Sequence, residues 1–231
     1  ENKFEILADK LKRLLQDKGV MDINISAIGG PCLASGLSNK INTNVVVVNK
    51  NIDSAQNIST LFRTNYYHLE ISNDMVGVEV SAAIKNIYAM AIGASKGVCG
   101  INISKEVIEN NHLNTAAALV KQSISEMLFF VEKLNGKKET VLGLAGIGDL
   151  YVSADGGRNS KMGSFLGDGY TYSEAKKTKM KNITVEGAEL IFEIGKKVKE
   201  DFNIKELPLM FATINSILED KKLEINWKNF Y

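Results

Sequence analysis

The stretch that decides the fold reads Gly77-Val78-Glu79-Val80-Ser81-Ala82-Ala83-Ile84-Lys85-Asn86-Ile87-Tyr88-Ala89-Met90-Ala91-Ile92-Gly93-Ala94. It is apolar almost all round, so we expect one long helix, over residues 75–95, that is buried on most sides. Lys85 is the only charged residue between Glu79 and Lys96, and none of its neighbours at helical spacing is a carboxylate. We expect Lys85 to be buried with its helix, although a lysine is costly to bury without a partner. One interpretation is a lysine that exchanges a proton in a small enclosed site. A lysine that snorkels to the surface or pairs with a distant acid is the alternative.

Upstream of this helix, strand and helix patterns alternate. Apolar residues recur at helical spacing over residues 4–15, and residues 21–28 alternate as in a strand. Val45 to Val48 is a β-branched run, typical of a strand buried on both faces. A short helix near residues 58–62 and a strand over residues 66–71 follow. Strands that alternate with helices predict part of an α/β sheet.

Downstream of residue 73 the sequence predicts helices and no strand. Residues 115–134 read as a second long helix that Gly136 terminates. Ser173 starts another helix, residues 190–198 form an amphipathic stripe, and Pro208 opens the last helix. We therefore expect two domains, an α/β part over residues 1–73 and a helical part over residues 74–231.

Composition limits the class of protein. The chain has 231 residues, 45% of them apolar and 24% charged, as in ordinary globular proteins, and its net charge of +1 gives no sign of nucleic-acid binding. No apolar run nears the ~20 residues of a membrane-spanning helix, and residues 1–4 do not resemble a signal peptide. We expect a cytoplasmic protein with Cys32 and Cys99 reduced. His68 and His112 lack the spacing of metal ligands, so no metal site is expected.

A glycine-rich segment, Gly143-Leu144-Ala145-Gly146-Ile147-Gly148-Asp149-Leu150, lies among the predicted helices. Its order is G-x-x-G-x-G, which is not the dinucleotide fingerprint G-x-G-x-x-G, so we do not interpret it as a nucleotide loop. The three glycines predict tight turns or a close approach of backbone. Asp149 can accept a hydrogen bond from a substrate hydroxyl or from Lys85, or it can cap a helix.

Three further turns carry candidate ligand-binding residues. Arg158 can grip a phosphate or carboxylate with two parallel hydrogen bonds, although an exposed loop arginine is the alternative. Glu186 can hold a ribose hydroxyl or simply favour a helix N-terminus. The Gly29–Cys32 turn follows a predicted strand, at the end where α/β sheets bind ligands, or it only terminates the strand.

Together these segments resemble the bacterial-type NAD(P)-dependent glycerol-3-phosphate dehydrogenase family. The matching segments, in the order of the family, are Gly30-Pro31 with Ala34, Gly77-Val78-Glu79, Ala83-Ile84-Lys85-Asn86, Asn114 with Ala117-Ala118-Leu119, Gly143 to Asp149, Arg158-Asn159 and Val185-Glu186-Gly187. They span about residues 25–218, so the resemblance covers nearly the whole chain.

The resemblance implies a fold and a function. The fold is the last strands of a Rossmann-type NAD(P)-binding sheet, residues 1–73, followed by an all-α substrate domain like the C-terminal domain of 6-phosphogluconate dehydrogenase. The function is interconversion of dihydroxyacetone phosphate and sn-glycerol 3-phosphate with NAD or NADP, by a protein that we expect to be a homodimer. Lys85 is then the catalytic proton donor and acceptor. The implied substrate-binding residues are Gly30, Cys32, Lys85, Asp149, Gly157, Arg158 and Asn159. The implied cofactor-binding residues are Ala34, Arg158, Thr184 and Glu186.

The sequence departs from the family at several positions. Cys32 replaces the usual serine or threonine, Gly157 stands where serine usually precedes the Arg-Asn pair, and Ser35-Gly36 replaces Lys-Glu. The family's nucleotide-binding G-x-G-x-x-G region and a second functional lysine would precede residue 1. We therefore expect these 231 residues alone to bind NAD(P) poorly and to turn over little. The alternatives are another hydroxyacid reductase of the same superfamily and an inactive, truncated helical dimerisation domain.

Overall fold

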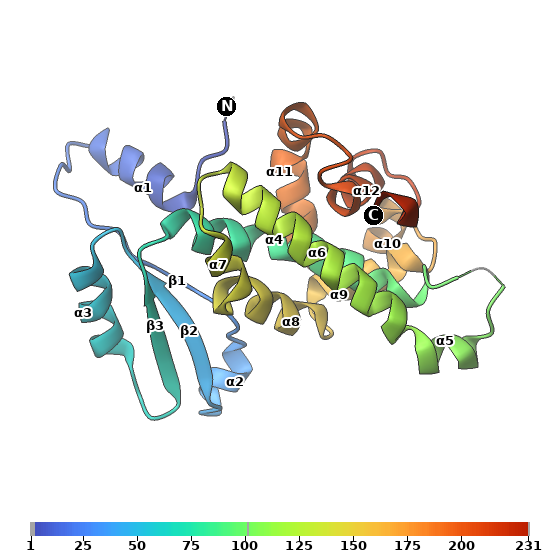
Figure 1. Ribbon diagram of the computed structural model, residues 1–231, viewed down its shortest axis with the longest axis horizontal. Coiled ribbons are helices and arrows are strands. Elements are labelled where there is room, and N and C mark those ends of the chain that lie inside the picture. The colour runs from blue at the N-terminus through green and yellow to red at the C-terminus, as the bar shows by residue number, and fades with distance from the viewer. Residues whose placement is uncertain (1–2, 101, 231) are drawn as a thin grey trace. The chain divides into compact units, whose positions relative to one another are not determined.

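The computed structural model describes residues 3–100 and 102–230 (Figure 1). The chain packs into two compact units. We call residues 1–83 and 128–149 the sheet unit, and residues 84–127 and 150–231 the helical unit. Two long helices, α4 (Met75–Gly93) and α6 (Leu113–Lys133), contribute residues to both units. These units are not the two predicted domains, and the domain boundary at residue 73 stays a prediction.

The sheet unit contains three strands, in the order β1 (Ala27–Gly29), β2 (Thr43–Val48) and β3 (Tyr67–Ser72). Strands β2 and β3 are parallel, and helix α3 (Ile52–Phe62) makes the crossover between them. This β-α-β connection confirms the predicted α/β remnant. Strand β1 pairs with β2 in the antiparallel direction, so the sheet is mixed.

The central strand β2 is buried on both faces, as its β-branched run predicts. Val46 and Val48 pack in a cluster with Met75 and Val78 of α4. Val45 and Val47 pack in a second cluster that contains residues of α3 and β3. The core of the sheet unit therefore lies on either side of this one strand.

The strand predicted over residues 21–28 is wrong in length, because β1 begins only at Ala27. Asn24 and Ser26 bond through their side chains to Nδ2 of the buried Asn49, at 2.8 and 2.7 Å. Side chains of this kind compete with ladder pairing for the local polar groups. Alternation alone does not reveal such a partner, which lies more than twenty residues away in sequence.

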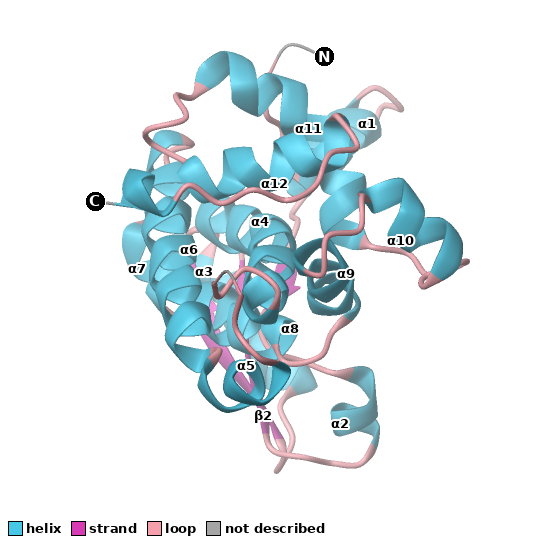
Figure 2. Cartoon of the chain, turned by 90° about the vertical axis from the view of Figure 1, so that its right-hand side faces the viewer, coloured by secondary structure: helices cyan, strands magenta, loops and turns pink. Residues whose placement is uncertain are grey.

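Helices form the rest of the chain, and the described residues after Ser72 contain no strand, as predicted. The predicted helices near residues 75–95 and 115–134 are α4 and α6, and Pro208 opens the last helix. The remaining helices are α1 (Leu7–Gln16), α2 (Ala34–Ser38), α5 (Lys105–Asn111), α7 (Lys138–Leu142), α8 (Asp149–Ala154), α9 (Arg158–Gly167), α10 (Tyr172–Thr178), α11 (Glu186–Asp201) and α12 (Pro208–Leu218). Figure 2 shows how strongly helix dominates the chain.

Helix α4 begins at a buried aspartate in the sheet unit. Asp74 Oδ1 accepts the backbone N–H of Gly77 at 3.0 Å, which caps the first turn of the helix. Its Oδ2 accepts the backbone N–H of Lys137 at 2.8 Å and the Thr140 hydroxyl at 2.6 Å. A side chain at Gly77 would place Cβ 1.8 Å from Asp74 Oδ2, so glycine is required there. One carboxylate therefore fixes the start of α4 and the start of α7.

The expectation that no apolar run reaches spanning length needs a correction. The segment Met75–Lys96 is long and apolar enough to cross a membrane by length and composition. However, 67% of its apolar window is buried inside the structure, as in the core helix of a globular protein. This burial accounts for its composition without a membrane.

Candidate active site

Lys85 lies in the part of α4 that belongs to the helical unit. Its neighbours Ile84, Ile87 and Tyr88 are at most 1% exposed, whereas Lys85 itself is only half-buried. The predicted burial of the lysine is therefore wrong, because the side of the apolar helix that carries Lys85 is partly exposed. Lys85 Nζ donates a hydrogen bond of 2.9 Å to Ser153 Oγ of α8.

Ser153 is a candidate site residue that the sequence pattern did not indicate. It lies four residues after Asp149 and five before Arg158, between two segments that the sequence singled out. Serine is common in helices and turns, so its sequence position carries no signal. The hydrogen bond from Lys85 makes Ser153 a candidate. Because the hydroxyl oxygen accepts one ammonium hydrogen, it aims the other Nζ–H groups.

Asn159 joins three helices of the helical unit. It is 5% exposed, and its Nδ2 donates to Asn86 Oδ1 of α4 at 3.0 Å. Its Oδ1 accepts the backbone N–H of Gly187, in the first turn of α11, at 2.8 Å. An amide nitrogen carries two N–H groups, and the Asn86 contact takes one of them. Asn159 therefore holds the residue next to Lys85 in place.

Small residues let α9 and α4 approach closely enough for this contact. A Cβ at Gly163 would lie 1.8 Å from the carbonyl oxygen of Met90. A Cβ at Gly93 would lie 2.1 Å from the carbonyl oxygen of Ser160. The two helices are thus in backbone contact, which brings Asn159 beside Asn86.

Arg158 and Glu186 form an ion pair at the surface of the helical unit. They are the first residues of α9 and α11, and their side chains are 59% and 37% exposed. An exposed ion pair stabilises little, so an anionic ligand can compete for the guanidinium at small cost. Gly157 is the N-cap residue of α9. Thr184 is exposed and lies two residues before the start of α11.

The sheet unit holds the other predicted residues. Gly30 directly follows β1 with a φ of 128°, which favours glycine. Cys32 is exposed, and Ala34 is the exposed first residue of α2. Asp149 is 6% exposed at the start of α8.

The glycine-rich segment forms a wide π-helical turn, Leu144–Gly148, in the same unit. A Cβ at Gly148 would lie 3.6 Å from Pro31 Cγ, and a Cβ at Gly30 would lie 3.7 Å from Leu144 Cβ. The structure therefore brings together two segments that lie more than a hundred residues apart. A Cβ at Gly146 would lie 2.0 Å from the carbonyl oxygen of Val141, so the close backbone approach predicted from the three glycines is confirmed.

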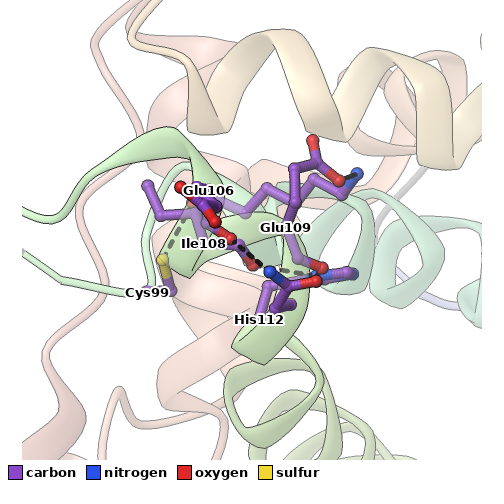
Figure 3. A network of polar contacts seen from close by, with 7 residues as sticks. Cys99, Glu106, Ile108, Glu109 and His112 are labelled. Carbon is purple, nitrogen blue, oxygen red and sulfur yellow. Dashed lines mark hydrogen bonds and ion pairs between the residues drawn. The ribbon is translucent and has the colours of Figure 1, made fainter.

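Both cysteines are free thiols, as expected. Figure 3 shows a polar network near α5 in the helical unit, where Cys99 Sγ donates to the carbonyl oxygen of Lys96 and His112 Nδ1 lies 3.2 Å from the carbonyl oxygen of Ile108. Lys96 also pairs with Glu109 at 2.6 Å. Within residues 3–100 and 102–230, no group of three His, Cys, Asp or Glu side chains is placed to hold a metal ion.

The chain thus combines a three-stranded α/β remnant with helices that present a lysine, an arginine and an asparagine, the class of architecture that the sequence predicts for the substrate-domain half of a dehydrogenase. Comparison with known proteins makes this class specific. The family model for the C-terminus of NAD-dependent glycerol-3-phosphate dehydrogenase matches residues 74–226. The chain therefore belongs to the glycerol-3-phosphate dehydrogenase family.

Individual relatives agree. The chain is 32% identical over 197 residues to the NADP(+)-dependent glycerol-3-phosphate dehydrogenase of Archaeoglobus fulgidus, which covers 83% of this chain and 55% of that protein. It is 31% identical over 182 residues to the NAD(P)+ enzyme of Clostridium tetani, with 78% and 49% covered. The crystal structure of the Coxiella burnetii glycerol-3-phosphate dehydrogenase matches with a TM-score of 0.73 at 26% identity, over 90% of this chain and 59% of that one. The chain spans about half the length of the curated relatives it matches.

Proposed function

We propose that the protein carrying this chain interconverts dihydroxyacetone phosphate and sn-glycerol 3-phosphate with NAD or NADP. The observation that carries the proposal is the arrangement of the helical unit. Lys85 is aimed by Ser153, the adjacent Asn86 is held by Asn159, and Arg158 stands at the surface beside Asn159 in sequence. A proton donor and a cation for a phosphate are the two groups that this substrate requires.

In this mechanism the Lys85 ammonium donates a proton to the ketone oxygen of the substrate as negative charge develops there. Its positive charge also stabilises the developing alkoxide, and in the reverse direction the amine takes the proton back. Ser153 keeps Nζ from rotating away, so less order is lost when the substrate binds. Arg158 grips the phosphate with parallel hydrogen bonds, and the second N–H of Asn159 adds to this contact.

The remaining predicted substrate contacts are Gly30, Cys32, Gly157 and Asp149, with Asp149 binding a substrate hydroxyl. A thiol at position 32 is a weaker hydrogen-bond donor than the family's hydroxyl, so we expect this contact to add little.

The predicted cofactor residues are Ala34, Arg158, Thr184 and Glu186. The exposed Arg158–Glu186 pair fits this role, because it offers a cation to a phosphate and a carboxylate to a ribose hydroxyl. When bound, the nicotinamide would supply the hydride. The sequence of 231 residues contains no G-x-G-x-x-G, so we expect this chain alone to bind NAD(P) poorly. The homodimer and the cytoplasmic location stay predictions.

The test follows oxidation of NADH or NADPH by dihydroxyacetone phosphate in the intact protein. Lys85→Ala should lower kcat by about 10²–10⁴-fold, the range for loss of a general acid. The matched control is Lys50→Ala, which removes an amine whose side chain is 71% exposed in the sheet unit and should leave kcat unchanged. Activity that survives Lys85→Ala would overturn the mechanism, and a 3-oxo acid reduced in preference to dihydroxyacetone phosphate would favour another reductase of the superfamily.

A further inference from the structure

A buried carboxylate in the helical unit takes no part in the chemistry proposed above. Glu126 lies on α6 and is 1% exposed. Its Oε1 accepts hydrogen bonds from Gln122 Nε2 at 2.9 Å and from the backbone N–H of Leu209 at 2.7 Å. Its Oε2 accepts the backbone N–H of Met210 at 2.9 Å and the Tyr88 hydroxyl at 3.2 Å. One side chain therefore ties α6 to α4 and to the first turn of α12.

The bond to Tyr88 reaches the helix that carries the lysine. Tyr88 is 0% exposed and lies three residues after Lys85, on the next turn of α4. A carboxylate at a helix N-terminus is favourable, so the first turn of α12 holds Glu126 in place. The Tyr88 hydroxyl then links this fixed point to α4. Rotation of α4 about its axis, or sliding of α4 along that axis, would break this link.

A different set of α4 residues contacts α9. Asn86 bonds to Asn159, and the carbonyl of Met90 lies against Gly163. Each helical residue turns the side-chain direction by about 100°. Residues 86 and 90 are two positions from Tyr88, so they point to nearly the opposite side of α4. Contacts of α4 with α9 and with Glu126 therefore restrain the helix in two directions.

The charge of Glu126 comes at a cost to the folded state. Burial raises the pKa of this carboxyl to about 7, although its four hydrogen bonds act in the opposite direction. Its polar neighbours are one amide, two backbone N–H groups and one titratable group, the Tyr88 phenol, whose pKa the same burial raises. A well-packed apolar set of side chains would avoid this cost. A buried polar network of this kind fixes one arrangement of the helices around it.

We propose that Glu126 is a positioning residue, which acts through the Tyr88 hydroxyl to set the rotation and register of α4 and so the place of the Lys85 amine. The role of the amine in hydride transfer rests on the proposed function, whereas the mechanical link between Glu126 and Lys85 does not. The two ideas can therefore fail separately.

The variants isolate the link in the intact protein. Tyr88→Phe keeps the ring and the α12 cap and removes only the bond from α4 to Glu126. Thr213→Val is the matched control, since Thr213 is 1% exposed and its hydroxyl donates to the carbonyl oxygen of Leu209 at 3.0 Å within α12. Each variant loses one buried hydroxyl bond, so melting temperatures of the two should fall by similar amounts. Glu126→Gln is a second test, because it also weakens the link and does not depend on Tyr88→Phe folding.

The first readout is the rate at which a small acylating reagent modifies Lys85, measured by mass spectrometry relative to Lys50. We expect Tyr88→Phe and Glu126→Gln to change this rate by about fivefold, the equilibrium factor that one hydrogen bond is worth, and Thr213→Val to leave it unchanged. The same rate in all three variants, or an equal change in all three, would overturn the proposal.

The second readout is the kinetics with dihydroxyacetone phosphate. A misplaced proton donor should lower kcat by about tenfold with little change in KM, and only in the two variants that weaken the link. An equal loss of kcat in Thr213→Val would mean a general loss of stability and would contradict the proposal. If the native protein does not turn over this substrate, the proposed function fails, while the acylation rates still decide the link.

Discussion

Replacing Asn159 with alanine removes both hydrogen bonds by which this side chain joins α9 to α4 and α11. The backbone N–H of Gly187, a buried residue, loses its acceptor, which costs about 1–3 kcal/mol, and the bond to Asn86 contributes about 1 kcal/mol more. Alanine is the better helix former by about 0.7 kcal/mol, which offsets part of the loss. The expected decrease in the free energy of unfolding is therefore about 1–3 kcal/mol. For a chain of this length that corresponds to a melting temperature lower by about 3–12 °C.

Thermal unfolding followed by circular dichroism measures this shift in the intact protein. The control is Asn110→Ala, since Asn110 is an exposed residue whose amide donates to the carbonyl of Glu106 one turn earlier in the same helix. Substitution there should change stability by less than about 0.5 kcal/mol. A melting temperature for Asn159→Ala no lower than that of Asn110→Ala would show that the amide does not join the three helices as argued.

Three further outcomes are expected. The pKa of Glu126 is raised from 4.5 to about 7, so its contribution to stability is fully present below pH 4.5 and is lost as the pH rises through 7. Between these pH values the native free energy of unfolding, measured with urea, should fall by about 3 kcal/mol relative to that of Glu126→Gln, and parallel pH profiles would contradict this. Gly163→Ala should destabilise the fold by about 3 kcal/mol, because Cβ would lie 1.8 Å from the carbonyl oxygen of Met90, and a melting temperature equal to the native value would refute that contact. Arg158→Lys keeps the charge but loses the parallel hydrogen bonds, so KM for dihydroxyacetone phosphate should rise about tenfold, and an unchanged KM would remove Arg158 from the phosphate site.

Local pattern predicted much of this chain. The β-branched run Val45–Val48 required a strand with two buried faces, and the structure has one. The helical periods of residues 75–95 and 115–134 predicted α4 and α6, because period and helix-stop residues depend only on near neighbours. A single charge in an apolar helix did not by itself distinguish a catalytic lysine from one that snorkels to the surface. The ordered family motifs identified Lys85 as the candidate.

Partners distant in sequence were beyond the reach of such patterns. The strand predicted at residues 21–28 is longer than β1, because Asn49 binds the side chains of Asn24 and Ser26. The antiparallel pairing of β1 with β2 has no local signature in the sequence. Lys85 is half-buried because only one stripe of α4 is left open, which depends on where other helices pack.

The helix that carries Lys85 shows where the division lies. Its sequence determined that residues 75–93 form an apolar helix with a single lysine near its centre, because helix formation and amphipathicity arise within a few turns. Tertiary structure alone decided that Ser153 aims that lysine and that Glu126 holds its helix. The donors to Glu126 from α12 lie 83 and 84 residues away in the chain. A hydrogen bond depends on distance in space, and packing brings these groups together without leaving a periodic trace in the sequence.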